Sequence, residues 1–203
     1  MTQWVENPTG GRARGPSGLV RAWLEVLVRP RRFFRTGVAP GDQAPGLAFA
    51  AAVVLGEELS RVALVAGAYP TFAGRPILSR VLALALVVTL VTPAVLHLTA
   101  ALETVLLLPT APDRGGVDGT VQVLAYATAP CLLAGIPWPP LRVACCLYGA
   151  ALLAVGTAEV HALAPWRAAA VAALPAALVF GYGFRGFAAV GALLSAAGLP
   201  GTF

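Results

Sequence analysis

Long blocks of apolar residues, separated by short breaks, dominate the chain after about residue 45. The breaks are rich in proline, glycine or charged residues, which interrupt regular structure. A helix needs about 17 to 25 apolar residues to cross a bilayer, and each block is long enough with some tilt. The pattern predicts an all-α fold, a polytopic transmembrane helix bundle of about five spans. These spans are expected near residues 46–67, 81–108, 121–138, 141–158 and 168–184.

The apolar pattern resumes after the fifth block and continues over residues 186–199. This stretch is shorter than the roughly 17 residues that a spanning helix requires. We therefore expect a reentrant or interfacial segment, and a short sixth span is the alternative.

The N-terminal 43 residues have a different pattern. Residues 1–16 combine proline, glycine and arginine with few apolar side chains, which predicts a mobile basic tail. From Ser17, apolar residues fall mostly on one helical face as far as Pro30, which predicts an amphipathic interfacial helix with Ser17 as its N-cap. The helix and its linker occupy residues 17–43, and the transmembrane domain occupies residues 44–203.

Arginine and phenylalanine residues follow this amphipathic helix. Arginine side chains bind anionic lipid headgroups, while phenylalanine side chains enter the boundary of the acyl chains. The bilayer is therefore a predicted partner of this segment, which is also able to pack against the helix bundle. The predicted membrane-surface contact comprises Arg29, Arg31, Arg32, Phe33, Phe34 and Arg35.

Composition agrees with lipid as the main surroundings of the chain. Apolar residues make up 58% of the sequence and charged residues 11%, whereas soluble domains have about 25% charged residues. Cys131, Cys145 and Cys146 lie inside apolar runs and lack the partner spacing of a zinc or haem site. We interpret them as small buried apolar side chains, and we predict no metal site and no cofactor.

The distribution of arginine indicates the orientation. Seven of the 14 basic residues lie within residues 1–43. Because positive loops remain on the cytoplasmic side, we predict a multi-pass protein of the cell membrane with a cytoplasmic N-terminus. The loops that contain Arg114 and Arg167 are then cytoplasmic, and the external segments contain Arg75, Arg80, Arg142 and Arg185.

Three charged residues, Glu57, Glu58 and Arg61, interrupt the first apolar block. A charge at the bilayer centre costs about 2.5 to 3.5 kcal/mol on insertion scales. Helical spacing allows both carboxylates to reach Arg61, and His97 in the second block is expected at a similar depth. We predict a buried polar cluster of these four residues that moves a proton or an ion, or switches helix packing with pH. The alternative is a static ion pair that fixes helix register.

Several short motifs follow one another along the chain. They comprise Pro-x-x-Phe-Phe at Pro30, Phe33 and Phe34, Tyr-Ala-x-x-Pro at Tyr126, Ala127 and Pro130, a Gly-Ile-Pro turn at residues 135–137, and Gly156 before a polar connection that contains Glu159 and His161. In this order they resemble the Yip (Ypt/Rab-interacting protein) family, in its prokaryotic branch. The resemblance covers about residues 19–184 and implies a membrane domain of five spans.

The resemblance also bears on partners. Eukaryotic members of the Yip family are associated with Golgi and endoplasmic-reticulum membranes, Rab-type GTPases and vesicle traffic. This chain is similar to them in its membrane domain, but its N-terminal tail is basic and lacks their long, acidic, proline-rich sequence. The difference argues against GTPase binding.

Catalytic motifs are missing from the sequence. It contains no glycine-rich phosphate loop, no His-Glu-x-x-His and no Gly-x-Ser-x-Gly. We expect a non-enzymatic membrane protein that organises membranes or recruits partners, and the alternative is a small transporter or channel built on the buried charges. Nucleic-acid binding is not expected, because headgroups and topology explain the basic tail.

Small and polar residues complete these expectations. The small-residue stretches at 168–177 and 181–191 favour close helix approach, either within the bundle or in a homo-oligomer. Glu103, Glu159 and His161 lie near the predicted cytoplasmic ends of spans, where charged groups reach water, so we expect them to be interfacial anchors.

Overall fold

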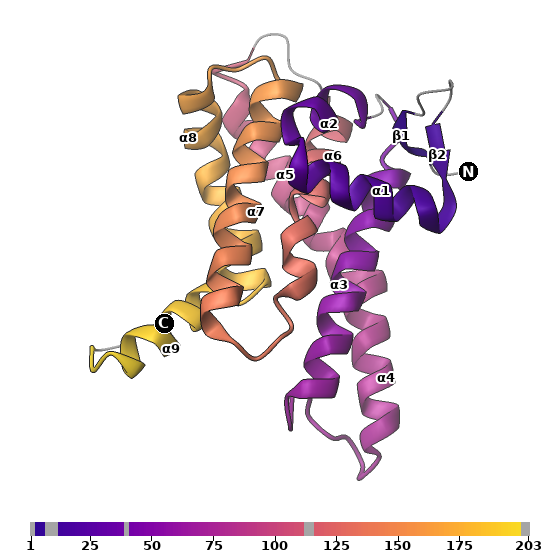
Figure 1. Ribbon diagram of the computed structural model, residues 1–203, viewed down its shortest axis with the longest axis vertical. Helices are drawn as coiled ribbons and strands as arrows, with labels where there is room; N and C mark the ends of the chain where they lie inside the picture. Colours follow the sequence, from indigo (N-terminus) through magenta and orange to yellow (C-terminus); the bar gives the residue numbers. More distant parts are fainter. Residues whose placement is uncertain (1–2, 7–11, 39–40, 112–115, 200–203) are drawn as a thin grey trace.

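The computed structural model describes residues 3–6, 12–38, 41–111 and 116–199, so Arg114 and part of the predicted tail lie outside the described residues. The all-α class is confirmed for the membrane domain (Figure 1). Three segments of π- or 3₁₀-helix, labelled η, interrupt the α-helices. The helical elements are α1 (Gly15–Val28), α2 (Pro30–Thr36), α3 (Ala44–Leu64), α4 (Pro76–Leu86), η1 (Val87–Val91), α5 (Thr92–Leu107), α6 (Gly116–Ala127), η2 (Ala129–Leu133), α7 (Pro139–Val160), α8 (Pro165–Ala176), η3 (Ala177–Gly183) and α9 (Gly186–Ala196).

A short hairpin lies within the segment for which the sequence predicts a mobile tail. Strand β1 (Gln3–Glu6) pairs with strand β2 (Arg12–Arg14) in an antiparallel two-stranded sheet. The low apolar content of this segment gave no sign of the pairing.

Three of the described helices are long and apolar enough to cross a membrane. They are Pro76–Leu107, Pro139–Val160 and Pro165–Gly183. Helix α3 has 21 residues, which is sufficient length, but it contains three charged residues, Glu57, Glu58 and Arg61, and is not among these three. The predicted count of five spans is therefore not confirmed by length and composition.

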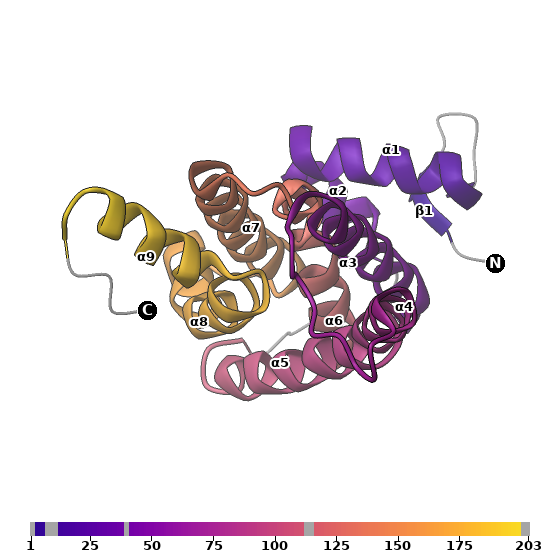
Figure 2. The same ribbon diagram turned by 90° about the horizontal axis from the view of Figure 1, so that it is seen from below.

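The third predicted span, at residues 121–138, is not one helix. Helix α6 ends at Ala127 and the 3₁₀ segment η2 follows, because Pro130 has no backbone N–H to continue an α-helix. All residues from 119 to 131 are buried. Figure 2 shows α6 enclosed by α3, α5 and α7, so this short helix forms the centre of the bundle.

Two π-helical segments occur next to prolines inside apolar runs. Segment η1 directly precedes the turn that contains Pro93, and η3 follows Pro175 closely. A proline removes a backbone donor and frees a carbonyl, which local changes in helix winding accommodate. After η3, Arg185 adopts a left-handed φ of 60° and the chain turns into α9, which leads away from the bundle (Figures 1 and 2). Helix α9 has 11 residues, too few to span a bilayer.

Helix α1 lies across the long helices of the bundle (Figures 1 and 2). Ala22 and Val26 are buried beneath it, and Trp23 Nε1 donates a 2.8 Å hydrogen bond to the carbonyl of Ala129. A helix is present where the amphipathic helix was predicted, its position at a membrane interface stays a prediction, and Ser17 is not its N-cap. The helix begins two residues earlier because Pro16 suits the first helical turn.

Candidate functional site

Four charged side chains meet near the C-terminal end of α3, and we call Glu57, Glu58, Arg61 and Arg185 the charge cluster. Arg185 forms an ion pair with Glu57, and its Nη1 lies 3.3 Å from Glu58 Oε1. Arg61 Nη1 lies 3.5 Å from Glu58 Oε2. Glu57 and Glu58 are only 1% and 5% exposed. Two buried carboxylates are therefore balanced by two guanidinium groups.

The loop after α3 folds back over the charge cluster. Tyr69 Oη donates a 2.5 Å hydrogen bond to Glu58 Oε2, and Arg61 Nη2 donates one of 2.5 Å to the carbonyl of Ala68. The Arg61 guanidinium also lies 4.9 Å from the centre of the Tyr69 ring. Burial and the hydrogen bond to Glu58 raise the pKa of Tyr69 above its ordinary value. The phenol therefore remains protonated and continues to act as a donor.

His97 does not belong to the charge cluster, which corrects the prediction. It is exposed on α5, where its Nε2 lies 2.9 Å from Gln43 Oε1 and its Nδ1 lies 2.7 Å from the carbonyl of Pro93. Gln43 precedes α3, about 21 Å along the helix axis from Glu57. The depth estimate was wrong because the second membrane helix begins at Pro76, five residues before the predicted start.

Arg185 is the cluster member that the sequence placed in an external segment. It follows η3 and reaches both carboxylates of α3, 127 and 128 residues away in the chain. The expected contact between Glu57 and Arg61 is not among the ion pairs of the described residues, since Arg61 pairs with Glu58. One signal for Arg185 was present in the sequence: it is a single charge between two apolar runs, where a carboxylate partner is to be expected.

A mainly apolar cavity of about 100 Å³ lies beside the charge cluster, between α3, η1, α5 and η3. Val91 and Val95 line it and keep 41% and 37% of their surface exposed. The cavity therefore reaches the outer face of a helix that is apolar enough to span a membrane. Its polar lining residues are Glu57, Glu58, Thr92 and Thr128. Across the described part of the chain, no group of three or more acidic, histidine or cysteine side chains is placed to bind a metal.

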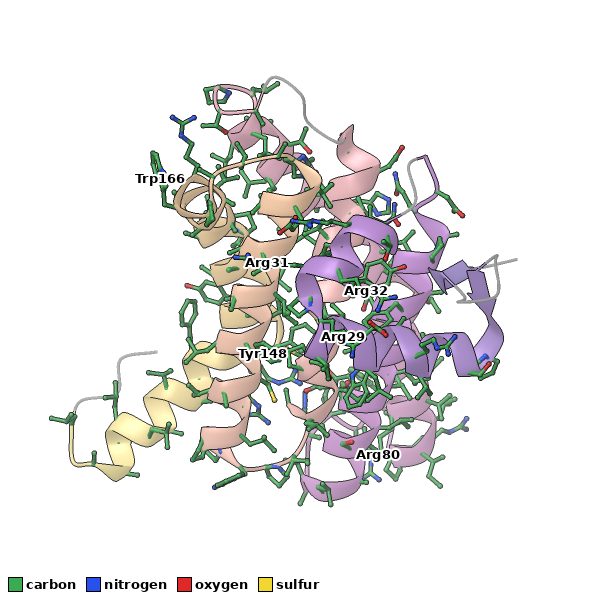
Figure 3. The ribbon with its side chains drawn as sticks, turned by 45° about the horizontal axis from the view of Figure 1, so that its top comes forward. Arg29, Arg31, Arg32, Arg80, Tyr148 and Trp166 are labelled. Atoms are coloured by element: carbon green, nitrogen blue, oxygen red, sulfur yellow. The ribbon has the colours of Figure 1, made fainter. Side chains whose placement is uncertain are left out.

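Arginines gather around α1 and α2. Figure 3 shows Arg29, Arg31 and Arg32 on one face of the molecule, and these three and Arg35 are exposed. Arg35 Nε lies 2.6 Å from Glu159 Oε2, and Arg31 Nε lies 3.8 Å from Oε1 of the same carboxylate. All four arginines of the predicted membrane-surface contact are therefore exposed, and two of them, Arg31 and Arg35, pair with Glu159.

The phenylalanines of that predicted contact are not at the surface. Phe33 and Phe34 are buried, so their assignment to the acyl boundary is wrong. The Phe33 ring centre lies 4.8 Å from that of Tyr126, and Phe49 approaches the same tyrosine at 5.0 Å. These two side chains pack against the bundle, which was the alternative that the sequence left open.

Motif residues that carry the family resemblance lie around this aromatic group of Phe33, Phe34 and Tyr126. Phe34 occupies the space that a side chain at residue 156 would need, because a Cβ on Gly156 would lie 2.9 Å from a ring carbon of Phe34. Tyr126 and Ala127 are buried in α6 within the same apolar core, and Pro130 is buried in η2. These residues therefore form a packing site that attaches α2, beginning at Pro30, to the bundle.

A second buried polar site lies near the C-terminal end of α7. Thr157 Oγ1 donates a 2.6 Å hydrogen bond to Glu103 Oε1, while Glu103 Oε2 has no partner among the described residues. His161 Nε2 lies 3.3 Å from Thr120 Oγ1, and burial lowers the pKa of His161 to about 4. Both Glu103 and His161 are buried, so their assignment as interfacial anchors is wrong.

Some of the small side chains pack inside the bundle, and others, such as Ala169 and Ala173, are exposed. Cys131, Cys145 and Cys146 are buried free thiols, as predicted. Ala168 and Ala172 of the first small-residue stretch are buried within the bundle. A homo-oligomer through these stretches stays a prediction.

Comparison with known proteins identifies one family. The model of the Yip1 domain matches residues 24–185, which include most of the bundle, the charge cluster and the motif residues. No curated protein and no solved structure matches the chain.

Proposed function

This chain belongs to the Yip1 domain family and is a membrane protein with several apolar helices, and on this premise we propose that it is a non-enzymatic component that organises membranes or recruits partners to them. The proposal places the working surface on α1 and α2. It assigns a supporting role to the charge cluster, in which the carboxylates and guanidinium groups mainly bind one another.

The exposed apolar stripe of α1 carries this proposal. Val20, Leu24 and Val28 follow one another at helical spacing and are 57%, 50% and 73% exposed. Arg21 and Arg29 flank the stripe, together with Glu25. A helix with an apolar face bordered by arginines suits the boundary between headgroups and acyl chains, and α1 lies across the long helices as such a helix must (Figure 1).

A topology of five spans with a cytoplasmic N-terminus forms part of the proposal. The segments α3, α4–η1–α5, α6–η2, α7 and α8–η3 run in alternating directions (Figure 1). The exposed arginines of α2 lie at the end of the bundle where α3 begins. At the other end, Arg61 and Arg185 are neutralised by glutamates. Arg75, Arg80 and Arg142 at that end have no described ion pair, so the proposed orientation rests on the number of arginines, seven of which lie within residues 1–43.

Photo-crosslinking in native cell membranes tests recruitment. A photoreactive amino acid replaces Leu24, and the adducts are identified by mass spectrometry. We expect defined protein adducts whose yield falls at least about fivefold when Arg29 and Arg32 are both changed to glutamate, because reversed charge repels an acidic partner surface. Adducts with lipid alone would restrict α1 to membrane attachment and contradict recruitment.

Two matched controls accompany this experiment. The same photoreactive group at Leu98, which is 72% exposed on α5, reports the random neighbours of a lipid-facing position. Arg80→Glu changes an exposed arginine of α4, far from α1 (Figure 3). Adducts that also form from Leu98, or that are lost equally in Arg80→Glu, would count against the α1 surface.

A small transporter or channel is the second candidate function. The observation in its favour is the cavity, which Glu57 and Glu58 both line. Ionisable residues inside membrane domains commonly mark ion or proton pathways. Proton or ion flux through proteoliposomes that Glu57→Gln abolishes would support it. A purified protein without flux would exclude it.

A further inference from the structure

One carboxylate oxygen in the charge cluster has no partner. Glu58 uses Oε1 for Arg185 and Oε2 for Arg61 and Tyr69, whereas Glu57 uses only Oε1, for Arg185. Among the residues that the structure describes, nothing donates a hydrogen bond to Glu57 Oε2. In this cluster, Arg185 Nε is the fully buried side-chain atom without a partner among the described residues. Glu57 is 1% exposed and lines the cavity, so a donor within the cavity would be able to reach Oε2.

The charge balance of the cluster restricts which chemical group can act as this donor. Glu57 and Glu58 already compensate Arg61 and Arg185, and Arg142 is a further positive charge that interacts with Glu57. A simple cation would add uncompensated charge in surroundings of low dielectric constant. A zwitterion adds no net charge, because its own anionic group accompanies the donor.

The walls of the cavity indicate an occupant with hydrocarbon chains. Val54, Val91, Val95 and Val179 line it, and the exposed parts of Val91 and Val95 extend it to the outer face of α5. Two of its walls contain the π-helical segments η1 and η3. Such segments are rare and frequently occur at functional sites. The cavity is therefore open to lipid and apolar except for its acidic end.

The acidic end lies at the depth of lipid headgroups. Arg185, which pairs with Glu57, follows the end of η3 at Gly183, and Gly135, just before α7, packs against the Glu57 carbonyl, so Glu57 lies where these helices begin and end. Helix α7 has 22 residues, about 33 Å in length, which matches the hydrocarbon thickness of a bilayer. Val95 on α5 lies about two turns from Val87 on η1, so an acyl chain beside these residues would lie along the continuous helix and within the bilayer.

We propose that this cavity binds the headgroup of an aminophospholipid, with the ammonium group donating a hydrogen bond to Glu57 Oε2 and an acyl chain along Val91 and Val95. A primary ammonium has N–H donors and fits a small cavity, whereas the quaternary ammonium of a choline lipid has no N–H and is larger. The site therefore distinguishes phosphatidylethanolamine from phosphatidylcholine. This lipid-binding proposal does not require that the protein recruits partners or transports ions.

Native mass spectrometry of the full-length purified chain in detergent micelles tests this site. The protein is titrated with phosphatidylethanolamine and with phosphatidylcholine that has the same acyl chains. We expect the first bound phosphatidylethanolamine to have a dissociation constant at least about tenfold lower, since a hydrogen bond to a charged group has about this effect. Equal constants for the two lipids would overturn the proposal.

Glu57→Gln tests the acceptor. Its carbonyl oxygen would still accept from Arg185, which leaves the amide NH₂ toward the cavity, where it repels an ammonium donor. We expect the preference for phosphatidylethanolamine to fall below about threefold. Glu159→Gln removes a carboxylate at the opposite face of the molecule and should keep the full preference. A full preference in Glu57→Gln would overturn the assignment of Glu57.

Val95→Trp tests the wall independently of the charges. Val95 is partly exposed, so a larger side chain is able to fill the cavity mouth without overpacking the bundle. We expect the affinity for phosphatidylethanolamine to fall at least about fivefold, whereas Val105→Trp, an exposed position on α5 away from the cavity, should leave it unchanged. Unchanged binding in Val95→Trp, or binding of a long-chain primary amine in place of the phospholipid, would overturn the proposal.

Discussion

The bundle buries carboxylates at two places, and the two differ in how they are compensated. At the charge cluster, Glu57 and Glu58 each pair with arginine. Near the other end of α7, Glu103 accepts a hydrogen bond from Thr157 and no described cation pairs with it. Thr157 is 15 residues from Arg142 along α7, which separates the two sites by about 22 Å.

This difference shows that burial alone does not define the role of a membrane carboxylate. A paired carboxylate links helices that are distant in sequence, as Arg185 links η3 to α3. A carboxylate bonded only to a hydroxyl group provides one short contact between α5 and α7. Neutralising the glutamate should therefore lower the free energy of unfolding at the charge cluster and change it little, or raise it, at Glu103.

The largest effect is expected for Arg185→Ala. The substitution leaves Glu57 without an ion-pair partner and Glu58 with only Arg61, and an uncompensated buried charge costs about 3 to 5 kcal/mol. We expect the free energy of unfolding to fall by this amount in a detergent-based unfolding titration. Glu57→Gln in the same chain should recover part of the loss, because it removes the uncompensated charge.

Arg80→Ala is the matched control for this prediction, since Arg80 is exposed on α4. It should change the free energy of unfolding by less than about 0.5 kcal/mol. A loss below 1 kcal/mol for Arg185→Ala would mean that the charge cluster does not hold η3 to α3.

Lowering the pH is expected to reduce the free energy of unfolding through His161, which lies in the second buried polar site. Its folded pKa is about 4 because burial disfavours the charged ring, and the ordinary value is 6.5. Between these values the unfolded chain binds a proton that the folded chain does not. The free energy of unfolding should therefore fall by up to about 3 kcal/mol as the pH is lowered from 6.5 to 4.

His161→Asn isolates this effect, since other groups also titrate at acidic pH. Thermal unfolding is measured for both proteins from pH 7 to pH 4. The difference between the two should change through this window and level off below it. Parallel curves would show that His161 is not responsible.

The sequence predicts the parts of this molecule that depend on local pattern. The amphipathic helix, the apolar helices and the buried cysteines follow from residue spacing and composition, and they are present in the structure. The break in the third apolar block depends on Pro130, which local rules also indicate. Its exact form, a 3₁₀ segment, depends on the surrounding helices.

Local sequence pattern is insufficient to predict which side chains pair across helices. His97 was placed beside Glu57 from an estimate of depth, whereas Arg185 fills that position. The depth was wrong because the start of the second membrane helix was misjudged, and a correct depth would still leave the rotation of each helix undetermined. Likewise, Phe33 and Phe34 resemble a membrane anchor in sequence, and only the space at Gly156 shows where Phe34 packs.

Neutralising one glutamate at each site compares them most directly. Glu57→Gln weakens the ion pair with Arg185 and should lower the free energy of unfolding by about 1 to 3 kcal/mol. Glu103→Gln keeps an acceptor for Thr157 and loses no described ion pair, so it should change stability by less than about 1 kcal/mol or increase it. Detergent-based unfolding titrations of both variants provide the measurement. A larger loss in Glu103→Gln than in Glu57→Gln would reverse the comparison.

The smallest effect is expected for the surface pair of Arg35 and Glu159, which serves as an exposed reference for both buried sites. Arg35 is exposed although its Nε lies 2.6 Å from Glu159, and water and salt screen such pairs. A double-mutant cycle with Arg35→Ala and Glu159→Gln should give a coupling energy below about 1 kcal/mol at low salt and close to zero at about 1 M salt. The same cycle with Glu57→Gln and Arg185→Ala should retain most of its coupling in high salt, because the pair is buried. If salt weakened both cycles equally, water would have to reach the charge cluster, and the contrast between buried and exposed pairs would fail.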